Sequence, residues 1–375
     1  RLPELHDAGS ALAMTGGRRR LIAVGSVLLL ASCAGVQNPY YDPAKPHHTA
    51  GGFRNLDPDA RIGGGFLRWQ WARRLNGLPK PPDAAHRDWR VAPDLALLRS
   101  PAVNPSVTWI GHASVLLRLG GINVLTDPHF SERASPVRFA GPKRYHPPGV
   151  ALVDLPQIDA VVISHNHYDH LDVDSVRQLH QRSGGTLHFF VPLGLKPWFA
   201  ELGIDSVTEL DWWDHAEFKG VRFTLTPAQH WSARSLFDRN RTLWGGWAIS
   251  APDLHFFFIG DTGYSPDFGE IGRRLGPFDL AAIPIGAYEP RWFMRAQHVD
   301  PAESLRIHRD LRARQSLGVH WGAFEMADEA LDEPPRALAA ARREAGIAAS
   351  EFFVLRVGET RRLAPRPSIA AGPGR

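Results

Sequence analysis

Four potential metal ligands lie within six residues of one another: His165, His167, Asp169 and His170. They follow an apolar run, 160–163, that has the character of a buried strand. In extended backbone, side chains two residues apart point the same way, so His165 and His167 can grip one cation together. Asp169 and His170 follow where the chain turns towards a helix, and they can face a second cation. Imidazole and carboxylate ligands without thiolate suit a catalytic zinc-type ion or iron, and they do not fix which.

Three further candidate ligands stand where other apolar runs stop. His230 follows the run 221–225, Asp261 follows 255–259 in a GDTGY turn, and His320 ends the run 316–319. The ends of strands are where α/β sheets present reactive groups. Taken alone, a histidine or aspartate that follows a strand is usually a cap or turn residue. Together with the dense cluster, the three residues predict a two-metal site.

The elements that must position these ligands alternate along the chain from residue 106 onward. Short apolar runs of strand-forming residues predict strands at 107–110, 122–125, 160–163, 187–191, 221–225, 255–259, 280–284 and 316–319. Helical patterns cover 173–181, 266–275, 301–312 and 335–345. Strands and helices mixed in one long run predict an α/β (α+β) sandwich rather than separate domains.

The motifs around the ligands resemble those of a known family. The matching segments run from about Thr108 to Pro335 and read TWIGHAS, LTDPHFSERASP, GPKR, SHNHYDHLD, FVPLGL, ELDWW, TPAQHW, GDTGYSP, IPIGAYEPRWFM, QHVDPAES, VHWGAFEMADE and EPP. They resemble the metallo-β-lactamase-fold hydrolases and, more narrowly, the phospholipase D enzymes that hydrolyse N-acyl-phosphatidylethanolamine, with their bacterial relatives. The resemblance implies a four-layer αβ/βα sandwich with the metals at one edge. It also implies release of phosphatidic acid and an N-acylethanolamine.

The same resemblance implies a ligand assignment for two zinc ions, with iron or manganese as alternatives. One ion is held by His165, His167 and His230. The other is held by the set Asp169, His170 and His320, and Asp261 bridges the two.

Paired cations about 3.5–4 Å apart can lower the pKa of a shared water to about 7 and neutralise charge on a phosphate. We expect hydroxide to attack phosphorus in line, with Asp261 and Asp169 orienting it. Gln297 and His298 are the candidates for supporting the leaving alkoxide, because the matching family motif lies by the pocket. For His298, a satisfied loop histidine is the alternative.

Three other polar residues have two interpretations each. Asp127, after a strand, fits a residue that hydrogen-bonds a metal-bound histidine, or a plain turn Asp before Pro128. His112 can approach the metals, although a structural hydrogen bond is favoured. Arg291 can meet a phosphate or form a surface ion pair.

Two other functions stay open at the level of sequence. The same metal site can cleave a different ester, such as a lactone or a small phosphodiester, because fold does not settle function. Ordinary phosphatidylethanolamine is a further alternative substrate, since lipid-pocket residues upstream of Ser106 cannot be carried over from the animal enzymes. The chain can also be an envelope lipoprotein with a non-catalytic metal site. Against that, structural zinc sites are usually closed by four ligands, often Cys.

The N-terminal region, residues 1–33, has the pattern of a signal peptide. Three arginines, 18–20, precede an apolar stretch at 21–31, and Leu-Ala-Ser-Cys ending at Cys33 resembles a bacterial lipobox. The arginines also resemble a twin-arginine signal. A buried thiol is the alternative for Cys33, which is the only cysteine, so no intrachain disulfide is possible. We expect a lipoprotein anchored to the bacterial envelope, in the periplasm or at the outer membrane.

Three further segments complete the predicted organisation of this 375-residue chain. An extension rich in Pro, Gly and aromatics covers 34–105, the catalytic domain covers 106–363, and a disordered tail covers 364–375. Within the extension, the apolar and aromatic residues set among arginines at 63–75 predict a short helix. This helix either lies on a membrane or packs on the domain. The net charge is +4 and no Lys/Arg run lies outside the signal, so nucleic acid is not expected as a partner. The sequence leaves the oligomeric state open, a dimer included.

Overall fold

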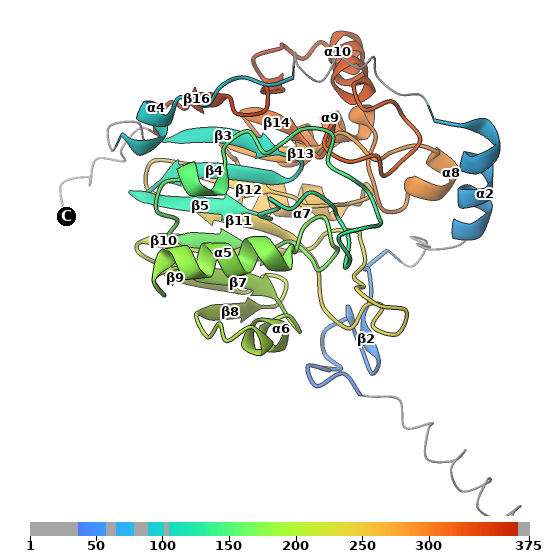
Figure 1. The fold of residues 1–375 in the computed structure, drawn as a ribbon, viewed down its shortest axis with the longest axis horizontal. Helices are drawn as coiled ribbons and strands as arrows, with labels where there is room; N and C mark the ends of the chain where they lie inside the picture. The colour runs from blue at the N-terminus through green and yellow to red at the C-terminus, as the bar shows by residue number, and fades with distance from the viewer. Residues whose placement is uncertain (1–36, 58–64, 79–88, 101–104, 367–375) are drawn as a thin grey trace, which may run out of the picture.

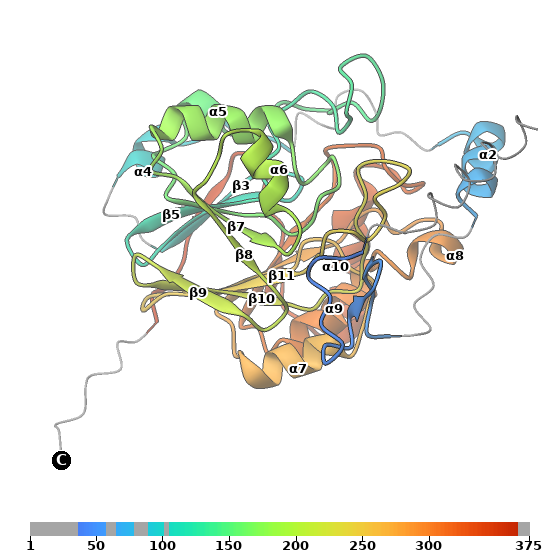
Figure 2. The ribbon, with the colours of Figure 1, turned by 90° about the horizontal axis from the view of Figure 1, so that it is seen from below.

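Two mixed β-sheets face each other, and helices cover the outer face of each (Figures 1 and 2). The computed structural model describes residues 37–57, 65–78, 89–100 and 105–366. The layers run helix, sheet, sheet, helix, so the predicted four-layer sandwich is confirmed. The predicted signal peptide, Cys33 and residues 367–375 lie outside the described residues.

The first sheet has seven strands. Their order is β16 (Thr360–Arg362), β3 (Ser106–Gly111), β4 (Ser114–Leu119), β5 (Ile122–Thr126), β6 (Ala160–Val162), β7 (His188–Pro192) and β8 (Val207–Leu210). From β5 to β8 neighbouring strands are parallel, and the others pair antiparallel. Its outer face carries α4 (Leu95–Arg99), α5 (Val173–Ser183) and α6 (Lys196–Glu201). The short 3-10 helix η1 (Leu152–Asp154) precedes β6.

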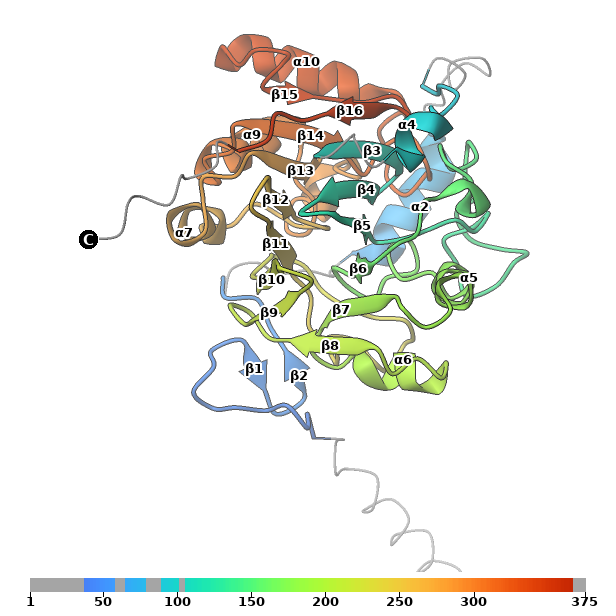
Figure 3. The same ribbon diagram turned by 90° about the vertical axis from the view of Figure 1, so that its left-hand side faces the viewer.

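The second sheet also has seven strands. Their order is β15 (Phe352–Phe353), β14 (Gln315–Val319), β13 (Leu280–Pro284), β12 (His255–Phe258), β11 (Gly246–Ser250), β10 (Val221–Thr226) and β9 (His215–Phe218). Strands β12 to β15 are parallel and β9 to β12 are antiparallel. Helices α7 (Asp267–Arg274), α9 (Pro301–Asp310) and α10 (Glu333–Ala345) cover its outer face (Figure 3).

The core lies between the two sheets, and a second apolar layer lies under the helices of the first sheet. In β4, Leu117 points into the first layer and its neighbour Leu116 into the second. Strands buried on both faces read as continuous apolar runs, which is why they are visible in the sequence. The sheets interlock through Phe190 of β7, which stacks on Phe223 of β10 with ring centroids 4.1 Å apart.

The N-terminal extension packs on this sandwich in two places. The hairpin of β1 (His48–Thr49) and β2 (Gly52–Phe53) lies below β8 in Figure 3. Helix α2 (Phe66–Asn76) lies beside α8 (Arg291–Met294), where buried Trp69 stacks on Phe293 at 4.8 Å. The predicted helix at 63–75 therefore packs on the domain through one face, while its opposite face is exposed. None of the helices in the described ranges combines the length and apolar character needed to cross a bilayer.

Candidate metal centre

All seven predicted ligands meet at one edge of the sandwich. They lie on the loops that follow β6, β10, β12 and β14, and the β3–β4 hairpin adds His112. His320 and His112 have positive φ angles of 62° and 52°. Non-glycine residues in this left-handed region are costly and cluster at functional sites. Here the sharp turn redirects each imidazole from the strand end towards the centre.

The first group of side chains consists of three imidazoles. His167 Nδ1 lies 2.8 Å from His165 Nε2 and 3.2 Å from His230 Nε2. His165 and His230 are almost fully buried. Burial lowers the pKa of His167 to about 4 and that of His230 to about 3, and it holds the pKa of His165 well below its usual value. All three rings are therefore neutral at pH 7, which is the form that binds metals.

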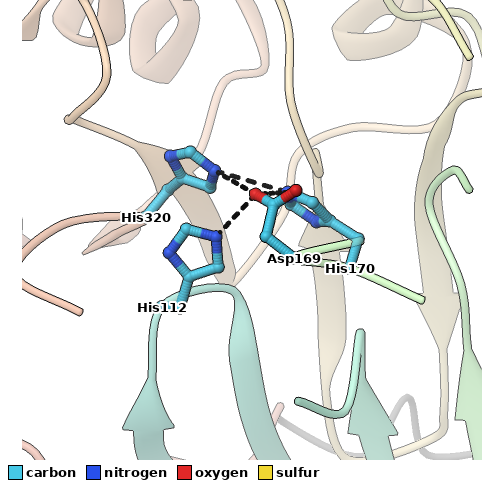
Figure 4. A group of neighbouring side chains, drawn as sticks. All are labelled: His112, Asp169, His170 and His320. Atoms are coloured by element: carbon cyan, nitrogen blue, oxygen red, sulfur yellow. Dashed lines mark hydrogen bonds and ion pairs between the residues drawn. The ribbon is translucent and has the colours of Figure 1, made fainter. Parts of the chain in front are cut away.

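The second group surrounds Asp169 (Figure 4). Asp169 Oδ2 lies 2.9 Å from His112 Nε2, 3.0 Å from His170 Nε2 and 3.5 Å from His320 Nε2. His170 Nε2 and His320 Nε2 are themselves 3.3 Å apart. Each of these side chains is buried.

Asp261 lies between the two groups. Its Oδ2 is 3.2 Å from His170 Nε2, and 3.9 Å from the Nε2 atoms of both His165 and His230. Its Oδ1 is 3.1 Å from His320 Nε2. A carboxylate placed in this way can ligate one cation in each group.

Protonation in the second group follows from its two carboxylates. Burial by itself opposes charge on any of these side chains. The carboxylates Asp261 and Asp169 outweigh it, raising the pKa of His320 to about 9 and that of His170 well above its usual value. Burial likewise tends to raise the pKa of both carboxyls, but His170 holds the pKa of each well below its usual range. Protonation of these two imidazoles is thus favoured by the buried carboxylates beside them.

These residues fit a pair of divalent cations. In the first group three neutral imidazoles converge, and a neutral ring has only one N–H to donate, so they cannot satisfy one another. In the second group a cation can replace the protons of His170 and His320 as the partner of the carboxylates, since metal binding releases protons. The donor set contains no thiolate, and it suits zinc, iron or manganese without selecting among them.

Asp127 forms the bond to a metal-facing histidine that its position after β5 predicts. Its Oδ2 lies 2.6 Å from His170 Nδ1, which leaves Nε2 of the ring facing Asp169 and Asp261. The main-chain N–H and the hydroxyl of Ser164 also donate to this carboxylate, at 2.7 and 2.5 Å. His170 is thereby fixed in tautomer and orientation, as expected for a histidine that binds a metal.

The two residues predicted to support the leaving group, Gln297 and His298, lie at the same edge of the sandwich and differ in what they contact. The main-chain carbonyl of Gln297 lies 3.1 Å from His230 Nδ1, while its side-chain amide contacts Met294. His298 Nδ1 lies 3.9 Å from Asp261 Oδ2. Burial lowers the pKa of His298 to about 3. Arg291 pairs with Glu303 at 2.6 Å and donates to the carbonyl of His298 at 2.9 Å, so of its two interpretations the ion pair is observed.

Sequence reasoning missed a contact to this centre from the N-terminal extension. The side chain of Asn55, in the N-terminal extension, hydrogen-bonds the main chain of His230. Nothing in the local sequence around Asn55 marks it, because its partner is 175 residues away. For His112 the favoured structural hydrogen bond is present, and its acceptor is Asp169 itself.

Comparison with known proteins adds three findings. The β-lactamase superfamily domain matches residues 122–321 of the chain. An N-acyl-phosphatidylethanolamine-hydrolyzing phospholipase D 1 of Caenorhabditis elegans is 49% identical over 229 residues, which cover 58% of this chain and 64% of the relative. The match therefore spans less than two thirds of that relative's length. An uncharacterized protein of Mycobacterium tuberculosis is 41% identical over 313 residues and 80% of each chain.

A solved structure shares the fold. It is a metallo hydrolase from the archaeon Ignicoccus hospitalis, with a TM-score of 0.52 and 22% identity. The alignment covers 68% of this chain and 97% of that one. At this identity the likeness concerns the fold alone.

Proposed function

The chain belongs to the β-lactamase superfamily and is a metal-dependent hydrolase of the metallo-β-lactamase fold, and on that premise we propose that it cleaves a phospholipid. The proposed substrate is N-acyl-phosphatidylethanolamine or a related lipid, hydrolysed between phosphorus and the head group. The products are phosphatidic acid and the released N-acylethanolamine or its counterpart.

The position of the Asp261 carboxylate carries this proposal. It lies within 3.9 Å of imidazoles from both groups, which is the arrangement that a site with two cations requires. A two-cation site suits in-line displacement at phosphorus, because it can stabilise both the attacking and the leaving oxygen. The sequence likeness to the Caenorhabditis elegans phospholipase D favours a phosphodiester over other esters.

Two zinc ions, when bound, lower the pKa of water towards about 7 and neutralise charge on the phosphate. In the proposed assignment His165, His167 and His230 would hold one ion, the set Asp169, His170 and His320 would hold the other, and Asp261 would be shared. Asp261 and Asp169 also orient the attacking water. Because its pKa is about 3, His298 is neutral at pH 7, so it donates a hydrogen bond to substrate rather than transferring a proton.

The exposed apolar side chains support the proposal that the protein acts at a lipid surface. Four of the most exposed are Leu236 (92%), Phe237 (86%), Phe139 (83%) and Leu67 (82%). They lie on three elements: α2, the loop 131–145 after β5 and the loop 231–243 after β10. Each element also carries exposed arginine, as in Arg68, Arg138 and Arg239. Apolar tips with basic neighbours suit an anionic membrane.

These three elements are tied to the segments that follow metal ligands. Trp69 of α2 donates to Asp328, and Tyr145 donates through its main chain to Ala323, both a few residues after His320. The carbonyl of Arg234 accepts from the hydroxyl of Tyr168, which lies among the first ligands. Docking through the apolar tips would therefore bring the metal edge to the lipid. A lipid anchor at Cys33, in the periplasm or at the outer membrane, is part of the same proposal.

The experiment is product analysis by mass spectrometry. The zinc-loaded protein is incubated with vesicles of N-acyl-phosphatidylethanolamine, with vesicles of phosphatidylethanolamine, and with soluble lactones and phosphodiesters. We expect phosphatidic acid from lipid vesicles and none after chelation of the metal. Turnover of lactones without any lipid cleavage would refute the phospholipid substrate. A protein that carries two metals and cleaves none of these esters would point to a non-catalytic site.

A further inference from the structure

A segment of the N-terminal extension reaches the metal centre. This segment, residues 38–55, is called the strap below, and it contains the β1–β2 hairpin. It begins below β8 in Figure 3 and ends at His230. Three attachments hold it on the sandwich: a charged anchor, an apolar plug and an amide at the metal ligand.

The anchor is a buried carboxylate that follows β8. Asp211 receives the imidazoles of His47 at 2.7 Å and His48 at 3.0 Å, and also the ammonium of Lys45. His48 Nδ1 lies 2.8 Å from the main-chain carbonyl of Tyr40 and 3.2 Å from the main-chain nitrogen of Asp42, so the ring that contacts Asp211 also holds the start of the strap. His47 stacks on Trp212 with ring centroids 4.3 Å apart. Because Lys45 already balances its charge, Asp211 serves as an anchor for the strap rather than as a ligand for a cation.

The apolar plug is Phe53, which is buried and belongs to the largest apolar cluster of the described residues. Its main-chain N–H donates to the carbonyl of Asn240 at 2.8 Å. The neighbouring Gly52 leaves room for this approach, since a Cβ there would lie 2.1 Å from that carbonyl oxygen. Asn55 lies two residues after Phe53, so the contacts of Phe53 and Gly52 fix where Asn55 meets the metal centre.

The amide is that of Asn55. Its Nδ2 donates to the carbonyl of His230 at 2.9 Å, and its Oδ1 accepts from the N–H of His230 at 3.1 Å. This pair of bonds imitates the pairing of a neighbouring β-strand. His230 lies beyond the end of β10, and its imidazole is oriented separately by the carbonyl of Gln297.

We propose that Asn55 is a positioning residue for the metal centre, and that the strap exists to deliver it. With the main chain of His230 held at both its N–H and its carbonyl, less ordering is needed for the imidazole to meet His165 and His167 when a cation binds. Partners that orient a metal ligand affect affinity in this way. The inference rests on His230 as a ligand and is independent of the lipid substrate.

The test is zinc binding by Asn55→Ala in the full chain, followed by competition with a chromogenic chelator. We expect one of the two zinc ions to bind about 10-fold to 100-fold more weakly, and the other to be unchanged. Asn123→Ala is the matched control, because it also removes a side-chain bond to a main-chain carbonyl, that of Gln157, in an exposed contact near the start of β5. Thermal unfolding of the metal-free proteins should be similar for the two variants.

A second variant covers the case in which Asn55→Ala does not fold. Asp211→Asn loosens the anchor without touching Asn55, and it should weaken the same zinc ion by a smaller factor. Wild-type affinity for both ions in both variants would overturn the proposal. So would an equal loss of both ions with a lower Tm, since that would be general destabilisation. Neither outcome depends on whether any lipid is cleaved, so the proposal on Asn55 and the proposed function can fail separately.

Discussion

At the scale of single residues, the centre is defined by what burial does to charge. Asp261 and Asp169 are both buried and both ionised, which is costly unless positive charge lies beside them. The protein supplies that charge through protons on His170 and His320, where a cation can take their place. The three imidazoles of the first group carry no such protons. The two groups therefore differ in how strongly proton release accompanies metal binding.

Replacing the shared carboxylate tests the role of Asp261 directly. Asp261→Asn removes one negative charge and one shared ligand, so we expect zinc content to fall from about two to about one per chain. Turnover should fall more than about 100-fold, because charge at the reacting centre is no longer balanced by paired cations. Zinc content is measured on the purified protein, and turnover by product analysis. Asp154→Asn, in a surface ion pair with Arg99, is the control. Full activity in Asp261→Asn would refute the shared role.

At the scale of elements, the strands that carry ligands were predictable and several others were not. Strands β6, β12 and β14 are buried on both faces, so their apolar runs 160–163, 255–259 and 316–319 stand out in the sequence. Strand β9 is largely exposed and lacks such a run. It exists because it pairs with β10 across a tight turn. Pairing of this kind is a tertiary effect that local composition does not report.

The residues of the candidate site also fall into those that the sequence could predict and those that it could not. His165, His167, Asp169 and His170 are close in sequence, and a period of two places the first pair together. His230, Asp261 and His320 were proposed because each follows an apolar run, and the family resemblance was needed to say which ion each of them would hold, since nothing local says which strand ends share an edge. Asn55 could not be found from sequence, since an Asn that pairs with a distant main chain leaves no periodic signal. The division of the chain at residues 34, 106 and 364 stays a prediction.

The anchor of the strap predicts a dependence of stability on pH. Burial alone would raise the pKa of the Asp211 carboxyl, but hydrogen bonds from His47 and Lys45 outweigh it and hold its pKa well below the usual range. A depressed pKa contributes stability that is present above the unfolded value of about 3.9 and is lost as pH falls through the folded value. Asp211→Asn should therefore lower Tm at pH 7.

The difference between Asp211→Asn and wild type should shrink as pH falls below about 4, because the wild-type carboxyl then loses its charge as well. Thermal unfolding of the metal-free proteins from neutral to acidic pH measures it. Asp205→Asn, at an exposed position nearby in the sequence, should show no such convergence. A constant difference in Tm at every pH would mean that Asp211 acts through packing and not through its charge.

At the scale of the whole molecule, apolar exposure is unevenly distributed. The large exposed side chains of α2, α8 and the loops 131–145 and 231–243 gather around segments that carry or follow metal ligands. In α2, Leu67, Trp71 and Leu75 are spaced by four residues, so they form one stripe opposite the buried Trp69. Val153 is similarly exposed but lies on η1, where its carbonyl accepts from Arg182 near the end of α5. The contrast between these positions makes membrane docking testable.

Leu236→Asp and Val153→Asp are a matched pair for that test. Each puts a carboxylate at an exposed apolar position, but only the first faces the proposed lipid surface. Losing one buried leucine costs about 1.5–3 kcal/mol of transfer free energy, so Leu236→Asp should weaken binding to vesicles by about tenfold or more.

Sedimentation with vesicles of phosphatidylglycerol and phosphatidylcholine, without any substrate, measures this binding. The protein used begins at residue 34, so that no lipid on Cys33 contributes. Weaker binding at higher salt would identify the arginines as partners of the anionic lipid. If both variants bind vesicles as wild type does, the metal edge is not the face that meets the membrane.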